Sequence, residues 1–166
     1  MQPLTAKKYY HQDGNNRTAI YTSKIIKAWY LENLSSRDAV VIVTRINNRA
    51  TMIASIYMDY NEKSPIIKPW FESIIERADM KGYAVLLGID SSSHSTLYGK
   101  ETNKGGEEIE DFIAQNRLTV ENVGTTPAFN TMWGTSIIDI TLTKRLASQS
   151  KTGLSKQNIT DRITIP

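Results

Sequence analysis

The chain has 166 residues, 40% of them hydrophobic and 22% charged, a composition typical of one globular domain with a sizeable core. It has no cysteine and only two histidines, which excludes disulfides, thiolate sites and multi-histidine metal sites and leaves carboxylates that favour a hard ion such as Mg²⁺. The net charge of +3 is weakly basic, and no apolar run predicts a membrane helix or a secretory signal, so we expect an intracellular protein that is not secreted and has no membrane partner.

The first 58 residues predict short strands joined by turns. A polar leader, residues 1–17, comes first. Segments rich in β-branched and aromatic residues follow at 18–22, 25–31, 39–45 and 51–58. The third of these is nearly all apolar, which predicts a central strand covered on both faces. Asn47–Asn48 predicts a hairpin turn between the third and the fourth.

Two amphipathic helices are predicted in the middle of the chain. Ser64 as N-cap and Pro65 as the first helical residue predict the start of one, and Lys81–Gly82 predicts its end. Its core-facing stripe at helical spacing consists of Ile66, Ile67, Trp70, Ile74, Ile75 and Ala78. The second helix is predicted after Gly105–Gly106. Its inward residues are Ile109, Phe112 and Ile113. The acids near its start complement the helix dipole and are assigned no chemistry.

Residues 83–99, between these helices, hold a buried strand that runs into a polar loop. The apolar run 84–87 ends in Gly88, and Asp90 follows just beyond it, before three serines and His94. Polar side chains at the end of a rigid strand are often part of a functional site. The structural alternative is that Asp90 caps a turn and that the serine loop is merely solvated.

The last third predicts three more strands, at 118–120, 136–142 and 158–165, with a polar, basic connection at 144–157. From Lys144 onward, five Lys or Arg residues stand against one acid, so this tail could face phosphates or could be a solvated surface. Strands interleaved with helices and hairpins predict an α/β fold with a mixed sheet. A single domain is expected over residues 1–166.

Acids occur in three of the predicted strand segments, at Asp90, Asp139 and Asp161. A charge within a strand is costly unless it is paired or bound to a ligand. Carboxylates that converge at strand ends could hold a divalent cation and orient water for attack on phosphorus. Three independent turn caps explain the same residues equally well.

The chain contains a series of short motifs, namely TAIY (18–21), SIY (55–57), GIDSSSHSTLYG (88–99), GEEIEDFI (106–113), PAF (127–129) and SIIDITL (136–142). Their order and spacing resemble the endonuclease/exonuclease/phosphatase superfamily, specifically the endonuclease domain of non-LTR (LINE-type) retrotransposons. The resemblance implies an α/β four-layer sandwich of two mixed sheets flanked by helices. It also implies a nuclear enzyme that uses Mg²⁺ or Mn²⁺ to nick target DNA and so primes a downstream reverse transcriptase domain of the same polyprotein.

The resemblance also implies roles for individual residues. Tyr57 would hydrogen-bond the scissile phosphate, and Asp90 would orient or deprotonate the attacking water. Asp139 would hold the catalytic histidine of the family's terminal Ser-Asp-His motif. Asp161, the middle residue of that motif, would contact the metal. His94 matches a histidine common in the retrotransposon loop, and we expect a hydrogen-bonded loop residue rather than a catalytic one.

The chain departs from the family pattern in three places. Ser92 stands where the family has an Asn that steadies the phosphate, and loss of one transition-state donor costs about 10²–10³ in rate. Arg162 stands where the catalytic histidine is expected, and arginine does not exchange a proton at neutral pH. Residues 1–17 do not match the family's opening section with its metal-binding Glu. We therefore expect a truncated domain that lacks the opening strands, with marginal stability or a partner covering the exposed sheet.

The prediction from the sequence is a metal-dependent DNA endonuclease domain of a retrotransposon with weak or no nicking. The alternative is a non-catalytic nucleic-acid-binding remnant that uses the basic tail and aromatic residues such as Tyr57 and Trp133. A remnant without function is a third possibility. Small-molecule phosphatases and abasic-site nucleases of the same superfamily share the Asp-x-Asn pattern, but motifs 106–113 and 136–139 favour the retrotransposon branch.

Overall fold

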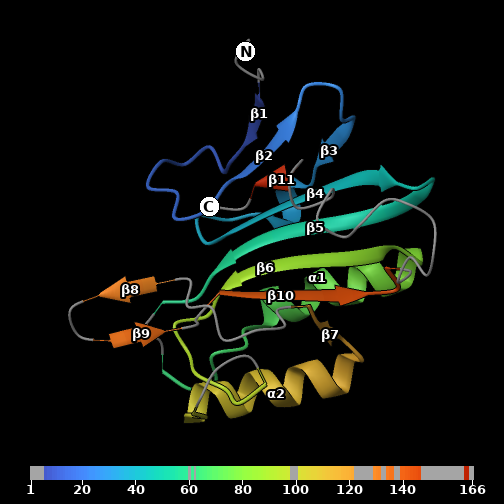
Figure 1. Ribbon diagram of the computed structural model, residues 1–166. Coiled ribbons are helices and arrows are strands. Elements are labelled where there is room, and N and C mark those ends of the chain that lie inside the picture. The colour runs from blue at the N-terminus through green and yellow to red at the C-terminus, as the bar shows by residue number, and fades with distance from the viewer. Residues whose placement is uncertain are drawn as a thin grey trace.

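The computed structural model describes residues 6–59, 61, 63–97, 101–121, 129–131, 134–136, 139–146 and 163–164. A six-stranded mixed sheet in the order β3-β4-β5-β6-β10-β7 forms its centre, and a three-stranded antiparallel sheet, β1-β2-β11, packs on one face (Figure 1). The helices α1 and α2 pack on the other face. The predicted α/β fold with packed sheets is confirmed. The described residues form three of its layers: the three-stranded sheet, the six-stranded sheet and the helices.

The elements have the following bounds. The strands are β1 (Ala6–Tyr9), β2 (Ile20–Ser23), β3 (Ala28–Tyr30), β4 (Ala39–Ile46), β5 (Arg49–Tyr57), β6 (Ala84–Asp90), β7 (Thr119–Val120), β8 (Phe129–Thr131), β9 (Gly134–Ser136), β10 (Asp139–Lys144) and β11 (Ile163–Thr164). The helices are α1 (Pro69–Lys81), α2 (Lys104–Asn116) and a short 3-10 helix, η1 (Glu32–Leu34). Neither α1 nor α2 has the length and hydrophobicity to span a membrane.

Two hydrophobic clusters hold the layers together because the side chains of β4 and β5 alternate between the two faces. Val41 and Met52 face the helices, whereas Val40, Ile42 and Ile53 pack against Tyr9 and Ile20 of the three-stranded sheet. The prediction that residues 39–45 form an interior strand buried on both faces is therefore confirmed. The predicted hairpin turn is also confirmed, since Asn47 and Asn48 have φ of 50° and 63°, the left-handed values of a type I′ turn.

The helix α1 connects the parallel strands β5 and β6, and the start predicted for it is wrong. It begins at Pro69 rather than at Ser64–Pro65. A helix through Pro69 would lack the N–H that bonds to the carbonyl of Pro65, and a residue before proline disfavours helical geometry, so Pro69 takes the first helical position instead. The buried face also shifts: Phe71 is buried and Trp70 is 37% exposed. The predicted end is confirmed, with Gly82 at φ 66°.

The helix α2 begins at Lys104, one residue before the glycine pair that was predicted to precede it. The Asn103 side chain caps the helix by accepting the Gly106 N–H at 2.8 Å. The predicted inward residues Ile109, Phe112 and Ile113 are buried, and the Phe112 ring lies 4.6 Å from that of Phe71. Both helices therefore bury their apolar faces in one core beneath the six-stranded sheet.

The remaining predicted strands are shorter in the structure or only partly described. The strand β2 overlaps the predicted range 18–22 and ends one residue beyond it, whereas β3 and β7 lie within 25–31 and 118–120. Residues 137 and 138 of the predicted strand 136–142 lie outside the described residues, and β10 begins at Asp139. Of the predicted strand 158–165, only residues 163 and 164 are described, as β11, which pairs with β2. The β8–β9 hairpin projects from the end of the molecule where β6 ends (Figure 1).

Candidate functional site at one end of the six-stranded sheet

Three of the predicted site residues meet at one end of the six-stranded sheet. Tyr57 is the last residue of β5, Asp90 the last of β6 and Asp139 the first of β10. The strand register places Tyr57 beside Asp90 and Asp139 directly opposite Asp90. Their neighbours Ile56, Ile89 and Ile140 pack into the helix-side core, so strand alternation turns all three residues to the other face. We call Tyr57, Asp90 and Asp139 the strand-end site.

The two acids of this site favour protonation more than ordinary carboxylic acids do. Partial burial raises the pKa of Asp90, and a hydrogen bond from the Ser92 backbone N–H opposes this shift. The Oδ1 atom of Asp90 is buried without a hydrogen-bond partner among the described residues. Partial burial and, second, the charge of Asp90 raise the pKa of Asp139, which is the more exposed of the two. Neighbouring carboxylates with raised pKa values at the ends of strands are common in functional sites.

The backbone of the serine loop after Asp90 has a conformation that suits asparagine. Ser92 has φ 49°, in the left-handed region, where Asn is enriched and most other non-glycine residues are disfavoured. The flanking Ser91 and Ser93 are buried, and the Ser91 hydroxyl bonds the Ser93 backbone at 3.2 Å. The loop therefore keeps a backbone shape suited to Asn at the position where the sequence has Ser92.

The helix α2 fixes the serine loop through its first turns. The His94 backbone donates to the Asn103 side chain at 3.3 Å and accepts the Asn103 N–H at 3.0 Å. The buried Ser95 hydroxyl donates to Glu110 at 2.5 Å. Gly106 lies so close that a Cβ atom there would be 1.7 Å from the His94 carbonyl oxygen. The side chain of His94 lies in an exposed position, and its predicted role stays a prediction.

The acids at the start of α2 have structural partners beyond the helix dipole. Glu108 accepts the Ile66 N–H at 2.6 Å and the hydroxyl of Ser64, and these bonds lower its pKa. Glu108 thus ties the segment before α1 to α2, as Glu110 ties the serine loop. Both contacts give these two acids a structural role.

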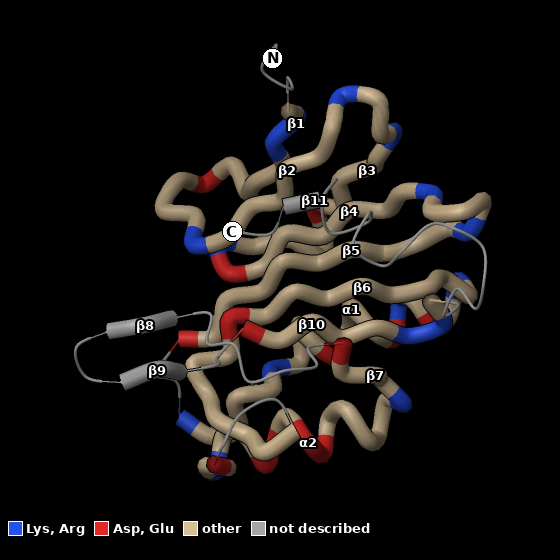
Figure 2. The backbone as a smooth tube through the Cα atoms, viewed as in Figure 1, with Lys and Arg blue, Asp and Glu red and all other residues tan. Residues whose placement is uncertain are grey.

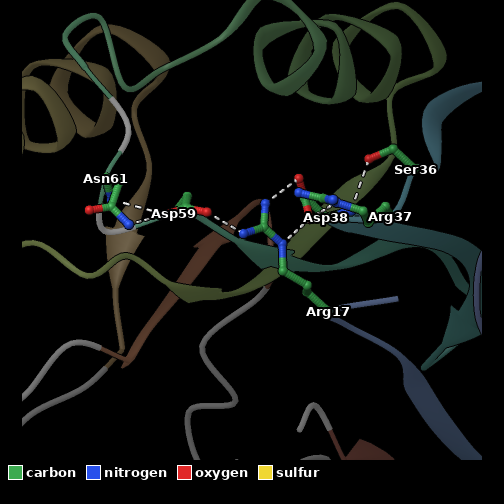
Figure 3. A network of polar contacts seen from close by, with 6 residues as sticks. All are labelled: Arg17, Ser36, Arg37, Asp38, Asp59 and Asn61. Carbon is green, nitrogen blue, oxygen red and sulfur yellow. Dashed lines mark hydrogen bonds and ion pairs between the residues drawn. The ribbon is translucent and has the colours of Figure 1, made fainter. Parts of the chain in front are cut away.

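A second charged group consists of Arg17, Asp38 and Asp59 (Figure 3). The Arg17 guanidinium donates to both oxygens of Asp38, at 2.5 and 2.7 Å, and also to Asp59. Its central carbon lies 4.4 Å from the centre of the Tyr57 ring. The backbone N–H of Tyr57 donates to the Asp38 carbonyl at 2.9 Å. This Arg17 cluster therefore contacts Tyr57 through both the ring and the main chain.

The charges of the Arg17 cluster are paired, with Arg37 as a second cation 3.3 Å from Asp38. The hydrogen bond to Asp38 raises the pKa of Arg17 above its ordinary value, against the effect of burial. Arg17 in turn lowers the pKa of Asp38. The pKa of Asp59 is lowered first by the Asn61 backbone N–H and then by Arg17. Arg17 thus uses three of its five N–H donors on the two carboxylates.

The sequence analysis missed the Arg17 cluster. Arg17 directly precedes the motif at 18–21, Asp38 precedes β4 and Asp59 follows β5, so acids at strand boundaries were a signal that could have been counted. The pairing itself joins residues 21 and 42 positions apart and depends on how the two sheets pack.

The residues predicted to complete a metal site are not all described. Asp161, the predicted metal ligand, and Arg162 lie outside the described residues. Within the described part of the chain, no three His, Asp or Glu side chains are close enough to hold a metal ion. Because Mg²⁺ requires near-octahedral oxygen coordination, Asp90 and Asp139 alone do not make a magnesium site.

The basic tail predicted from Lys144 onward is in part an ion-pair network. Lys144 and Arg145 bind the two oxygens of Asp79 at 2.8 and 2.9 Å, and Arg145 also donates to the Tyr83 carbonyl at 3.2 Å. The first two cations of the tail thus fasten the end of β10 to α1. Lys151, Lys156 and Trp133 lie outside the described residues.

The fold is the α/β fold of endonuclease/exonuclease/phosphatase proteins, as the sequence predicted. A family model described as "Endonuclease-reverse transcriptase" matches residues 51–161, and the chain belongs to this family.

Two solved structures share the fold. One is the endonuclease domain of TRAS1, a telomere-specific non-LTR retrotransposon, with a TM-score of 0.70 and 21% identity over 84% of this chain and 67% of that chain. The other is an endonuclease/exonuclease/phosphatase family protein from Leptotrichia buccalis C-1013-b, with a TM-score of 0.51 and 10% identity over 86% of this chain and 61% of that chain. No curated protein sequence matches the chain.

Proposed function

We propose that this chain is a retrotransposon endonuclease domain that acts on DNA in a metal-dependent reaction and nicks it weakly or not at all. The observation that carries the proposal is the alignment of Tyr57, Asp90 and Asp139 by strand register in a member of the Endonuclease-reverse transcriptase family. The DNA substrate, Mg²⁺ or Mn²⁺, a reverse transcriptase domain in the same polyprotein and a nuclear location are parts of this proposal.

The chemistry available at the strand-end site fits phosphodiester hydrolysis. Asp90 has a raised pKa and a buried oxygen without a partner, so it is a stronger base than an ordinary carboxylate and can orient a water molecule or accept its proton. The Tyr57 hydroxyl can donate to a phosphate oxygen. Asp139 lies opposite Asp90 and keeps the edge electronegative.

Two residues of this chain lead us to expect weak nicking. Ser92 has a short hydroxyl where the family has an amide, and removal of one transition-state donor costs about 10²–10³ in rate. Arg162 replaces a histidine that would exchange protons, a contribution worth about 10²–10⁴. The two losses together would bring nicking near the background rate.

The test restores the missing amide. Because Ser92 already has the left-handed backbone that Asn favours, Ser92→Asn should be accommodated without strain and should raise the nicking rate of supercoiled plasmid about 10²-fold. The assay is run with Mg²⁺, with Mn²⁺ and with EDTA. Thr96→Asn makes a similar change in the same loop and should leave the rate unchanged.

Three results would overturn the proposal. Strong nicking by the natural sequence, abolished by Asp90→Ala, would refute the predicted impairment. A Ser92→Asn variant that folds normally and gains nothing, or a gain that survives Asp90→Ala, would refute the roles assigned to these residues. Single-stranded or duplex DNA binding that survives Asp90→Ala without any nicking would favour the alternative, a non-catalytic nucleic-acid-binding remnant.

A further inference from the structure

The two ends of the six-stranded sheet differ in charge (Figure 2). At the end with the strand-end site, Asp38, Asp59, Asp90 and Asp139 outnumber the nearby cations Arg17 and Arg37. The strands β4 and β5 meet at the opposite end, in the hairpin turn at residues 47–48. Basic residues gather around this hairpin and around the loop between β2 and β3, at the right and top of the view. The excess of cations at the hairpin end would attract the phosphates of a nucleic acid.

Four exposed cations form the charge of the hairpin end. Lys24 and Lys27 come from the loop between β2 and β3, and Arg45 and Arg49 flank the hairpin turn. Among the described residues, no acidic side chain forms an ion pair with any of them, in contrast to Lys144 and Arg145, which are bound to Asp79. These four charges therefore remain available to an anionic ligand.

An exposed aromatic ring lies near two of these cations, Lys27 and Arg45, whereas Arg49 pairs with Ile46 and extends from the other face of the hairpin. Trp29, in the edge strand β3, is 59% exposed, although tryptophan is usually at least half covered. Its register partner is Val43, two residues before Arg45 on the same side of β4, so the indole and the guanidinium extend from the same face. Lys27 lies just before β3 on the same edge.

The backbone that carries this surface is well fixed. The Thr44 hydroxyl donates to the Lys27 carbonyl at 2.8 Å, which ties the β2–β3 loop to β4. Arg45 donates to the Asn48 carbonyl at 3.2 Å across the two-residue turn. A fixed backbone reduces the entropy that is lost when the side chains of this surface bind a ligand.

We propose that Lys24, Lys27, Trp29, Arg45 and Arg49, the hairpin-end patch, bind a single-stranded nucleic acid. The cations contact its phosphates, and Trp29 stacks on a base. A duplex hides the faces of its bases, whereas a single strand offers both the phosphates and the faces that this combination recognises. The patch lies at the other end of β4 and β5 from Tyr57 and Asp90, so its action is separate from the proposed nicking. RNA and single-stranded DNA share the required chemistry.

The test measures binding of labelled oligonucleotides of about 20 nucleotides to the whole chain by fluorescence anisotropy. The three ligands are uridine-rich RNA, thymidine-rich single-stranded DNA and duplex DNA. Lys27→Gln, Arg45→Gln and Arg49→Gln together should reduce the salt slope for single strands by about 2, since each phosphate contact contributes about 0.7. Trp29→Ala should weaken binding about tenfold, and Trp29→Phe should keep most of the affinity.

A matched control removes the same charge elsewhere, with Lys63→Gln, Lys104→Gln and Arg117→Gln, all at exposed positions. This control should leave the affinity for single strands within about twofold of the natural chain at the same salt concentration. No detectable binding by the natural chain, or an equal loss in the control, would overturn the proposal. Binding that depends on the cations but not on Trp29, or that prefers the duplex, would overturn the single-strand assignment. The relative affinities for RNA and DNA identify which strand is the ligand, and plasmid nicking, scored separately, tests the proposed function.

Discussion

The acidic end of the six-stranded sheet holds two groups of carboxylates that differ in how their charges are balanced. Asp38 and Asp59 share the guanidinium of Arg17, and their pKa values are lowered. Asp90 and Asp139 face each other from neighbouring strands, and their pKa values are raised. The two groups are adjacent, since the main chain of residues 57 and 58 bonds to the carbonyl groups of Asp38 and Asp90, at 2.9 and 2.8 Å.

This difference separates a structural role from a functional one. Carboxylates bound to arginine through two hydrogen bonds stabilise the fold and have little left to offer a substrate. Carboxylates that are partly buried beside each other cost stability, and such a cost is common where a site needs a reactive group. Changes in the two groups should therefore move stability in opposite directions.

The largest loss of stability is expected where the serine loop, which follows Asp90, meets α2. Gly106→Ala would place a Cβ atom 1.7 Å from the His94 carbonyl oxygen, so the loop or the helix must move, at a cost of about 3 kcal/mol. Urea unfolding should report this as a lower midpoint. Gly105→Ala is the matched control, because its Cβ would meet the movable hydroxyl of Ser93 at 2.5 Å and the cost should be much smaller. Equal midpoints for the two variants would contradict the close contact.

The next largest loss of stability is expected from a change in the Arg17 cluster. Arg17→Met leaves Asp38 and Asp59 without their cation and removes the contact with the Tyr57 ring. The side chains of Arg17 and Asp38 are each 26% exposed, so the cost should lie between that of a surface pair and that of a buried pair, at about 2 kcal/mol. Arg17→Lys keeps the charge but loses the two-pronged geometry, and it should recover only part of this loss. Full recovery would show that charge alone matters.

Many of the strands and much of the core could be predicted from the sequence because their patterns are local, whereas β1 lies in the predicted polar leader and β8 and β9 were not predicted. The apolar run at 39–45, the turn at Asn47–Asn48 and the stripe Ile109, Phe112 and Ile113 each depend on neighbours within one element. The start of α1 was wrong because two prolines, Pro65 and Pro69, competed for one position. Pro69 takes the first helical position because it has no N–H to donate within a helix.

The candidate site could be predicted only in part. Asp90 and Asp139 were found because acids in strands are unusual, and the resemblance added Tyr57. Their alignment follows from the pairing of β5, β6 and β10, which no local pattern determines. Arg17 was missed because its partners come from segments that meet only when the sheets pack.

A gain in stability is expected from a change at Asp90. Asp90→Asn removes a partly buried charge and its repulsion with Asp139, while the Asn carbonyl can still accept the Ser92 N–H. We expect a gain of about 1 kcal/mol at pH 7, or about 2–4 °C in Tm for a chain of this size. Asp90→Ala loses the hydrogen bond as well and should gain less. A loss of stability in Asp90→Asn would mean that the Asp90 charge has a counter-charge in the folded protein.

The smallest effect is expected in the pH dependence, where the two groups should oppose each other. The pKa of Asp38 is lowered from 3.8, so its stabilising effect is present above pH 3.8 and is lost as the pH falls through its folded-state pKa. The pKa of Asp90 is raised from 3.8, so the stability that protonated Asp90 contributes is present below pH 3.8 and is lost as the pH rises through its folded-state pKa.

Urea midpoints of the natural chain, Arg17→Met and Asp90→Asn, measured between pH 3 and pH 7, separate the contributions of the two groups. The difference between Arg17→Met and the natural chain should shrink toward pH 3, because protonated carboxyls no longer need the guanidinium. The advantage of Asp90→Asn should be absent at pH 3 and grow toward pH 7. Differences that stay constant across this range would show that neither group of carboxylates has the protonation equilibrium that its surroundings predict.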